Sequence, residues 1–105
     1  MDSKKVVKGR AALLPRRSDY AKAFQKDWAA LQAKGINLAA LKEVMTLLVA
    51  NEGPLGAEWK DHSLKGQQSG FRECHAGGDL LLIYELRDDA VIFVRAGTHS
   101  QLFGR

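Results

Sequence analysis

The chain has 105 residues, 46% hydrophobic and 27% charged, which is enough for one domain with a modest core of its own. Its single cysteine, Cys74, excludes an internal disulfide framework and is typical of a reducing compartment. No run of 18 apolar residues and no signal-peptide pattern occurs, so the sequence predicts a soluble, cytoplasmic protein without a membrane partner.

The formal net charge of +4 is unevenly distributed. Residues 1–17 hold six basic side chains and one acidic one, whereas residues 18–105 hold ten basic and eleven acidic ones. We therefore expect a flexible basic tail over residues 1–9, followed by one domain over residues 10–105. The tail is either merely solvated or contacts phosphates, and both readings are open at this point.

The N-terminal part of the domain predicts a strand and a helix. The short apolar stretch RAALLP, residues 10–15, ends at proline and suits an edge strand. Ser18 is a possible N-cap for a helix that runs to about Gly35. Behind it, aromatic and apolar side chains recur at helical spacing: Tyr20, Phe24, Trp28 and Leu31. Such a stripe could be a binding face, but core packing is the more common role and is the one we predict.

A second helix follows after a short link. Asn37 can cap it, and it is expected to end near Asn51, so the two helices form an antiparallel hairpin. Its apolar face consists of Leu38, Leu41, Met45, Leu48 and Val49. Residues 52–70 then form a long polar, glycine-rich loop, which indicates either a functional segment or disorder. Because it contains Trp59 and His62, we interpret it as functional.

Three strand patterns separated by hairpin-length turns complete the chain, over residues 71–76, 80–86 and 91–97. The resulting fold class is α+β, an antiparallel sheet of about four strands packed against the N-terminal helical hairpin. Simple alternation along the last strand places Phe93 and Arg95 on the same face.

The residues able to carry chemistry gather at the predicted strand ends. The three histidines are His62, His75 and His99, and Asp79 and Arg95 flank them. Each has an ordinary structural alternative: a solvated loop residue, a turn-fixing pair between His75 and Asp79, or a cross-strand ion pair of Arg95. The histidines lie 13 and 24 residues apart and no paired-ligand motif occurs, so no metal site is predicted. Cys74 faces away from its neighbour His75, which argues against a cysteine nucleophile.

Taken as a set, these side chains suit RNA cleavage without a metal ion. Imidazole exchanges protons near neutral pH, guanidinium binds phosphate, and an aromatic ring stacks on a base. In such a reaction the ribose 2′-hydroxyl attacks the neighbouring phosphorus, and the developing charge needs a cation.

Three segments resemble the YafQ branch of the RelE-type toxins: KDHSLKG (60–66), FRECHAGGDLLLIYEL (71–86) and RAGTHSQLFG (95–104). These are bacterial mRNA interferases of type II toxin–antitoxin systems. The resemblance runs from about residue 10 to the end. It implies a RelE-like fold and an endoribonuclease that cuts mRNA in the ribosomal A site without a cofactor. It also implies a cognate antitoxin, with operator DNA bound only through the toxin–antitoxin complex.

The resemblance also assigns residues. It implies catalytic roles for five residues, with His99 as the best candidate for the general acid: His62, His75, Asp79, Arg95 and His99. Phe103 corresponds to an aromatic residue that holds the nucleotide, and Lys60 and Arg72 in the matched segments are further candidates for substrate binding. Leu80 stands where this branch often carries tryptophan; because a leucine stacks less well on a base, we expect a different substrate affinity or codon preference.

Two other functions stay open. One is a degenerate relative that binds a protein or RNA without cutting, which the presence of all the matched residues disfavours. The other is a basic nucleic-acid-binding module, which would need a basic face that residues 18–105 do not provide.

Overall fold

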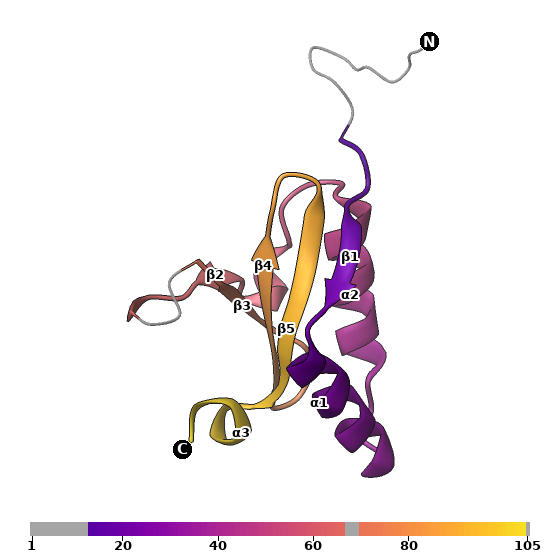
Figure 1. Ribbon diagram of the computed structural model, residues 1–105, viewed down its shortest axis with the longest axis vertical. Helices are drawn as coiled ribbons and strands as arrows, with labels where there is room; N and C mark the ends of the chain where they lie inside the picture. Colours follow the sequence, from indigo (N-terminus) through magenta and orange to yellow (C-terminus); the bar gives the residue numbers. More distant parts are fainter. Residues whose placement is uncertain (1–12, 67–69, 105) are drawn as a thin grey trace.

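The structure, a computed structural model, describes residues 13–66 and 70–104. Its main elements are a five-stranded sheet and three α-helices with one short 3₁₀ turn: β1 (Arg17–Tyr20), α1 (Lys22–Ala33), α2 (Ala39–Ala50), η1 (Ala57–Trp59), β2 (His62–Ser63), β3 (Arg72–His75), β4 (Leu80–Leu86), β5 (Ala90–Thr98) and α3 (His99–Phe103). The predicted α+β class, with a helical hairpin against a sheet, is confirmed (Figure 1). The expected tail over residues 1–9 lies outside the described residues.

The strand order across the sheet is β1-β5-β4-β3-β2. The three hairpin-linked strands β3, β4 and β5 are antiparallel neighbours, as predicted. The sheet has five strands rather than about four, because β2 adds to one edge and β1 to the other, where it runs parallel to β5. This long-range parallel pairing joins residues about 70 positions apart, and local sequence patterns do not reveal it.

The first strand and helix begin later than expected. Leu13, Leu14 and Pro15 lie outside any strand, so RAALLP is not the edge strand where it is described; β1 starts at Arg17. Ser18 lies within β1 and caps no helix, since α1 starts at Lys22. These residues form a strand rather than a helix because their backbone groups pair with β5. The Arg17 N–H also donates to the Asp89 carbonyl.

The helix ends agree better with the sequence. Gly35, with φ of +69°, follows the last turn of α1, a conformation that glycine adopts without strain. Asn37 accepts a hydrogen bond from the Ala39 N–H at 2.9 Å at the start of α2, and Asn51 closes α2 in the left-handed region. The hairpin that these residues delimit packs on one side of the sheet (Figure 1).

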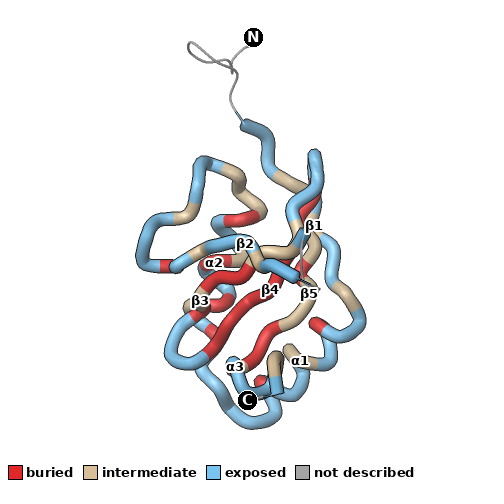
Figure 2. Tube along the Cα trace, turned by 90° about the vertical axis from the view of Figure 1, so that its left-hand side faces the viewer, coloured by how far each residue is buried: buried red, intermediate tan, exposed pale blue. Residues whose placement is uncertain are grey.

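The core lies between the helices and one face of the sheet. Helix residues Phe24, Leu31, Leu41, Val44 and Leu48 contribute to it, together with alternate residues of β3, β4 and β5. Figure 2 shows the buried residues concentrated on these three strands. Phe24 and Leu31 of the predicted stripe are buried and Trp28 packs against them, which confirms the core role, whereas Tyr20 belongs to β1 and is 47% exposed.

None of the helices in the described part of the chain is both long and apolar enough to cross a membrane.

Candidate active site

A cleft of about 540 Å³ opens where the β3–β4 turn meets the start of α3. Three of the predicted catalytic residues line it: His75, Asp79 and His99. The remaining lining residues are Glu73, Gly78, Leu81, Thr98 and Ser100. Segments 20 or more residues apart in sequence are thus brought to one end of the sheet.

The sheet register explains how these residues meet. His75 pairs with Leu81, and Leu81 pairs with Gly97 on β5, so the three share one row and one face. A side chain at Gly97 would meet Gln101 and Leu102, and this glycine therefore lets α3 fold back closely over the row. Asp79 lies in the turn just before β4 and is exposed.

His99 begins α3 and is exposed; the sequence analysis predicted no helix after the last strand. Thr98 caps the helix: its side chain accepts from the Gln101 N–H at 3.2 Å, and the Gln101 side chain accepts from the Thr98 N–H at 2.8 Å. The THSQ spacing is a capping-box signal that could have predicted this helix. One turn after His99, Phe103 packs against it, with ring centroids 4.9 Å apart.

His62 is linked to the cleft by Glu73, a residue that the sequence analysis did not single out. Its Nε2 lies 3.0 Å from Glu73 Oε1, and its Nδ1 lies 3.2 Å from the Ser63 carbonyl oxygen. Glu73 is only 8% exposed and also lines the cleft. Because an ionised carboxylate only accepts, Nε2 is the donor in this pair. Alternation along β3, which places Glu73 on the same face as His75, is the signal that could have identified it.

Arg95 reaches this face through an irregularity in β5. Phe93 pairs with Tyr84 and Arg95 pairs with Ile83, so Val94 is an extra residue without a partner on β4. Such a bulge reverses the alternation beyond it. The prediction that Phe93 and Arg95 share a face was therefore wrong: Phe93 is fully buried under the helices, whereas Arg95 lies in one row with Ile83 and Glu73.

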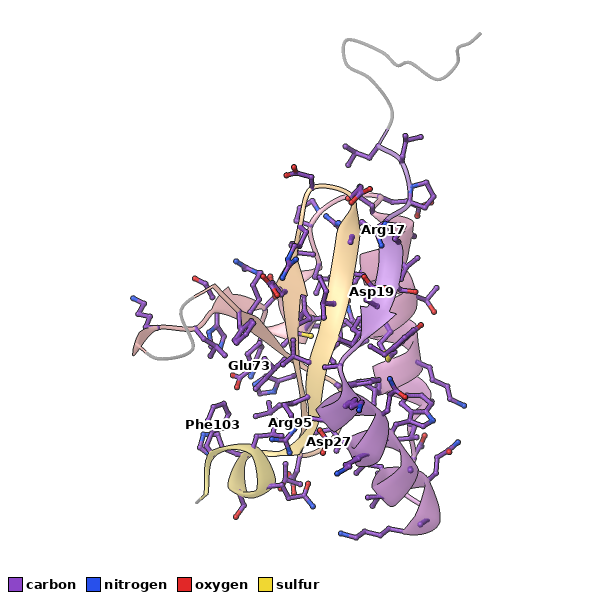
Figure 3. All side chains as sticks on the ribbon, viewed as in Figure 1. Arg17, Asp19, Asp27, Glu73, Arg95 and Phe103 are labelled. Carbon is purple, nitrogen blue, oxygen red and sulfur yellow. The ribbon has the colours of Figure 1, made fainter. Side chains whose placement is uncertain are left out.

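The Arg95 guanidinium stands beside the cleft rather than in its lining. It donates from Nε to Asp27 Oδ2 at 2.7 Å and from Nη2 to Asp27 Oδ1 at 3.1 Å, where Asp27 belongs to α1 (Figure 3). This pair raises the pKa of Arg95 above its ordinary value, chiefly through the hydrogen bonds that Arg95 donates to Asp27. No sequence pattern pointed to Asp27.

Two predicted substrate-binding residues lie away from the cleft. Arg72 precedes Glu73 and so faces the opposite side of the sheet, where its Nε and Nη2 donate to Asp61, the shortest at 2.7 Å. The Tyr84 hydroxyl also donates to Asp61. Lys60 is exposed and lines a separate hollow with these three residues. The Asp61 network fixes the segment just before His62.

Cys74 and Leu80 also belong to the helix-covered side. Cys74 is fully buried, and burial raises the pKa of its thiol to about 12, so the thiol is neutral and inaccessible. Leu80 is 5% exposed within the core. A leucine at this position therefore packs against the helices and does not stack in the cleft.

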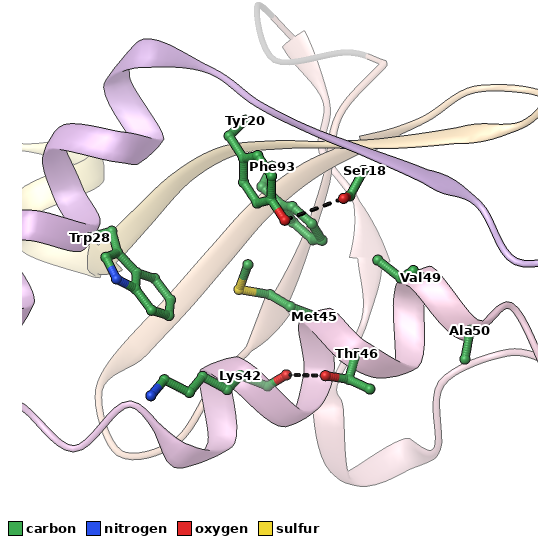
Figure 4. Close-up of a pocket in the computed structure, with 9 residues that line it drawn as sticks. All are labelled: Ser18, Tyr20, Trp28, Lys42, Met45, Thr46, Val49, Ala50 and Phe93. Carbon is green, nitrogen blue, oxygen red and sulfur yellow. Dashed lines mark hydrogen bonds between the residues drawn. The ribbon is translucent and has the colours of Figure 1, made fainter.

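A further hollow of about 460 Å³ lies between the helices and β1 (Figure 4). Its lining is mostly apolar and aromatic: Ser18, Tyr20, Trp28, Lys42, Met45, Thr46, Val49, Ala50 and Phe93. Among the described residues that line it, Lys42 is the only ionisable group besides the Tyr20 phenol, and it lies 5.9 Å from the Trp28 ring centroid. Without an acid–base pair, this hollow offers no counterpart to the histidine cleft.

The cleft can therefore move protons and bind anions. It gathers imidazoles and carboxylates on an accessible surface, with a guanidinium and an aromatic ring beside it. Within residues 13–66 and 70–104, no three His, Cys, Asp or Glu side chains converge as a metal site requires.

A small α+β domain with this sheet, helical hairpin and histidine cleft defines a class of protein, the toxins of bacterial type II toxin–antitoxin systems. The sequence model of one family in this class, described as "Bacterial toxin of type II toxin-antitoxin system, YafQ", matches residues 16–104. The chain belongs to the YafQ family.

Individual relatives agree. The mRNA interferase toxin YafQ of Escherichia coli K12 is 40% identical over 92 residues, which cover 88% of this chain and all of the relative. The crystal structure of YafQ from E. coli BL21(DE3) superimposes with a TM-score of 0.80 at 40% identity, over 85% of this chain and 99% of that one. YafQ in the E. coli DinJ–YafQ toxin–antitoxin complex gives a TM-score of 0.79 at 41% identity, over 87% of this chain and all of that one.

Proposed function

We propose that this YafQ-family toxin is an endoribonuclease that acts in the cytoplasm and cuts mRNA in the ribosomal A site without a metal ion. The observation that carries the proposal is the cleft in which His75 at the end of β3 and Asp79 of the β3–β4 turn meet His99 of α3. A family member of 40% identity named an mRNA interferase supports the same activity.

The reaction that suits these groups is an internal transesterification of RNA. The ribose 2′-oxygen forms a bond to the adjacent phosphorus while the bond from phosphorus to the 5′-oxygen of the next nucleotide breaks. A base accepts the proton of the 2′-hydroxyl, and an acid donates a proton to the leaving 5′-oxygen. The products are a 2′,3′-cyclic phosphate and a free 5′-hydroxyl, so no oxidant or cofactor is consumed.

His99 is the general acid in this scheme. It is exposed at the first position of a capped helix, and the Phe103 ring against it restricts its orientation. His75 and Asp79, across the same cleft, are the groups available to accept the 2′-hydroxyl proton. The role of base is assigned to this pair and not to one of its members.

His62 and Arg95 provide charge. Glu73 accepts from His62 Nε2 and thereby orients the ring at the edge of the cleft. Arg95, on the same face of the sheet, offsets the negative charge that develops on the phosphate oxygens. Phe103 supplies an aromatic surface for the nucleotide. Lys60 and Arg72 contribute to phosphate binding only outside the cleft, because neither lines it.

The expected protein partner is an antitoxin. The E. coli YafQ of similar fold is found in a complex with DinJ. We infer a cognate antitoxin for this chain that inhibits it, with operator DNA bound only by the toxin–antitoxin complex.

The experiment is tightly induced expression of the wild-type protein beside His99→Ala, with primer extension on a reporter mRNA. Growth arrest with in-frame cuts in the wild type alone is the expected result. Equal arrest by both proteins would locate the toxicity outside His99. Soluble wild-type protein that gives neither arrest nor cuts would contradict the proposal and identify a non-catalytic relative.

A further inference from the structure

Arg95 is held by one carboxylate from a distant part of the chain. Asp27 lies on α1, 68 residues before Arg95, and its two oxygens accept from Nε and Nη2 at 2.7 and 3.1 Å. The Asp27 side chain is 16% exposed and the Arg95 side chain 37%. Planar pairing through two parallel hydrogen bonds fixes the direction of the guanidinium as well as its place.

The same carboxylate also binds the backbone of β5. Asp27 Oδ2 accepts from the Ala96 N–H at 2.9 Å. This contact falls just past the point where β1 stops pairing with β5, at the Tyr20–Phe93 pair, and just past the extra residue Val94. The carboxylate therefore satisfies an edge N–H that no strand covers, and it holds the bulge that turns Arg95 toward the cleft side.

Pairing with Asp27 leaves the phosphate-binding edge of Arg95 available. A guanidinium carries five N–H groups, and Asp27 occupies the one on Nε and one on Nη2. The remaining N–H groups, two on Nη1 and one on Nη2, form the outer edge that can bind two phosphate oxygens. Asp27 and a phosphate can thus bind Arg95 at the same time, on different edges.

The other arginine–carboxylate pairs of the described residues differ from this one. Arg17–Asp19, at 3.4 Å, and the long-range pair Arg17–Asp89, at 3.5 Å, are both exposed, with the Arg17 side chain 64% exposed and the two carboxylates 55% and 76% exposed. Arg87–Glu85 is local, two positions apart. Arg72–Asp61 lies on the helix-covered side. Arg95–Asp27 alone among them is bidentate, long-range and located on the face of the cleft.

We propose that Asp27 is a positioning residue for RNA cleavage: it holds the Arg95 guanidinium with its outer edge directed at the scissile phosphate. This inference rests on the proposed function. A cation that is already oriented needs no reordering when charge develops on the phosphate, which is the source of its effect on rate.

A double-mutant cycle tests whether Asp27 acts through Arg95. Single-turnover cleavage of ribosome-bound mRNA is measured for the wild type, Asp27→Ala, Arg95→Ala and the double variant. We expect Asp27→Ala to lower the maximal rate about 10- to 100-fold, with a smaller effect on the half-saturating ribosome concentration. In the Arg95→Ala background the same change should have no further effect. Independent losses that multiply in the double variant would overturn the inference.

Two further variants separate positioning from folding. Asp27→Asn keeps one oxygen, which can accept from the Ala96 N–H and Arg95 Nε as Oδ2 does, but it removes the charge and the acceptor for Nη2. An intermediate rate with little change in melting temperature is therefore expected. Asp19→Asn removes the same charge from the exposed pair and should leave the rate unchanged. A loss of rate in Asp19→Asn equal to that in Asp27→Asn would assign the effect to net charge and overturn the inference.

A measurement without RNA keeps this test distinct from that of the proposed function. The Arg95 side-chain Nε–H signal in ¹⁵N NMR should exchange slowly with water in the wild type and rapidly in Asp27→Ala, whether or not the protein cuts RNA. Rapid exchange in the wild type, equal to that of Arg17, would overturn the positioning role. If the wild-type protein shows slow exchange but cuts no mRNA, the restraint of Arg95 by Asp27 would be supported, and the proposed cleavage of mRNA would be contradicted.

Discussion

The two faces of the sheet are built from neighbouring residues of the same strands, yet they differ in every physical property. Cys74, Leu82 and Phe93 are fully buried against the helices. Glu73, His75 and Arg95, each one or two positions away from one of these residues, face the cleft side and keep polar partners or solvent. A strand can carry both sets because successive side chains point to opposite faces.

The difference between the faces extends to their ionisable groups. Burial raises the pKa of the Cys74 thiol to about 12 and, with the hydrogen bond to Asp61, raises that of the Tyr84 hydroxyl. Both groups are therefore neutral at physiological pH and serve packing. On the cleft side the ionisable groups are paired across elements, as in His62–Glu73 and Arg95–Asp27. The helix-covered face contributes to stability through burial, whereas the cleft face carries groups that can exchange protons or bind an anion.

Deleting Val94 should have the largest effect on the difference between the helix-covered face and the cleft face. Without the extra residue, β5 would resume simple alternation, direct Arg95 into the core and take it out of register with Asp27. An unpaired buried charge costs about 3–5 kcal/mol, so we expect a large loss of stability together with loss of cleavage. The free energy of unfolding from urea titration measures it, and Val94→Ala, which keeps the bulge, is the control. Near-wild-type stability after the deletion would refute the role of the bulge.

Phe93→Ala should affect the covered face alone. The Phe93 ring is fully buried and packs against Phe24 and Tyr20, with centroids 5.8 and 5.6 Å apart. Removing it should lower the free energy of unfolding by about 3–5 kcal/mol, through lost burial and the cavity that remains. At a temperature where the variant is still folded, cleavage per folded molecule should match the wild type. A selective loss of cleavage with unchanged stability would contradict the division between the faces.

Much of the fold followed from local sequence patterns. Signals within a few residues of one another were read correctly: the apolar stripe of α2, that of α1 beyond Tyr20, Gly35 and Asn51 at the helix ends, and the turns between β3, β4 and β5. The family was also recognisable, because its motifs are contiguous in the chain, and the match over residues 16–104 confirms it.

The errors share one cause, which is that they depend on distant contacts. Ser18 looks like a helix cap, but pairing with Val91 places it in β1. Arg95 was assigned to the face of Phe93, because no local feature announces the bulge at Val94. Asp27 became visible only when the element that carries its partner was in place, whereas alternation along β3 could have pointed to Glu73. The catalytic assignments themselves remain predictions, although the structure brings three of those residues into one cleft.

Arg72→Ala and His75→Ala form a matched pair on β3 that should respond in opposite ways. Arg72→Ala leaves Asp61 without its main partner, so we expect a loss of about 1–3 kcal/mol in stability and little change in cleavage per folded molecule. His75→Ala should lower the cleavage rate about 10²–10⁴-fold with a nearly unchanged melting temperature. Loss of cleavage without loss of stability in Arg72→Ala would restore this arginine to the substrate-binding residues.

The smallest expected effect is a change in how stability depends on pH. The thiol of Cys74 titrates near its ordinary value of 9.0 in the unfolded chain and at about 12 in the folded protein. Above pH 9 the unfolded state therefore binds fewer protons than the folded state, and the free energy of unfolding falls as pH rises, by up to about 1.4 kcal/mol per pH unit for this one group.

Between pH 9 and 10 the buried thiol should contribute before the Tyr84 hydroxyl does, because the ordinary pKa of a tyrosine is 10.0. Cys74→Ala should flatten the slope in that interval, whatever it does to absolute stability, and urea titrations at pH 8, 9 and 10 would measure this. An unchanged slope would mean that the thiol ionises as easily in the folded protein as in the unfolded chain, and the covered face would then be less sealed from water than its burial indicates.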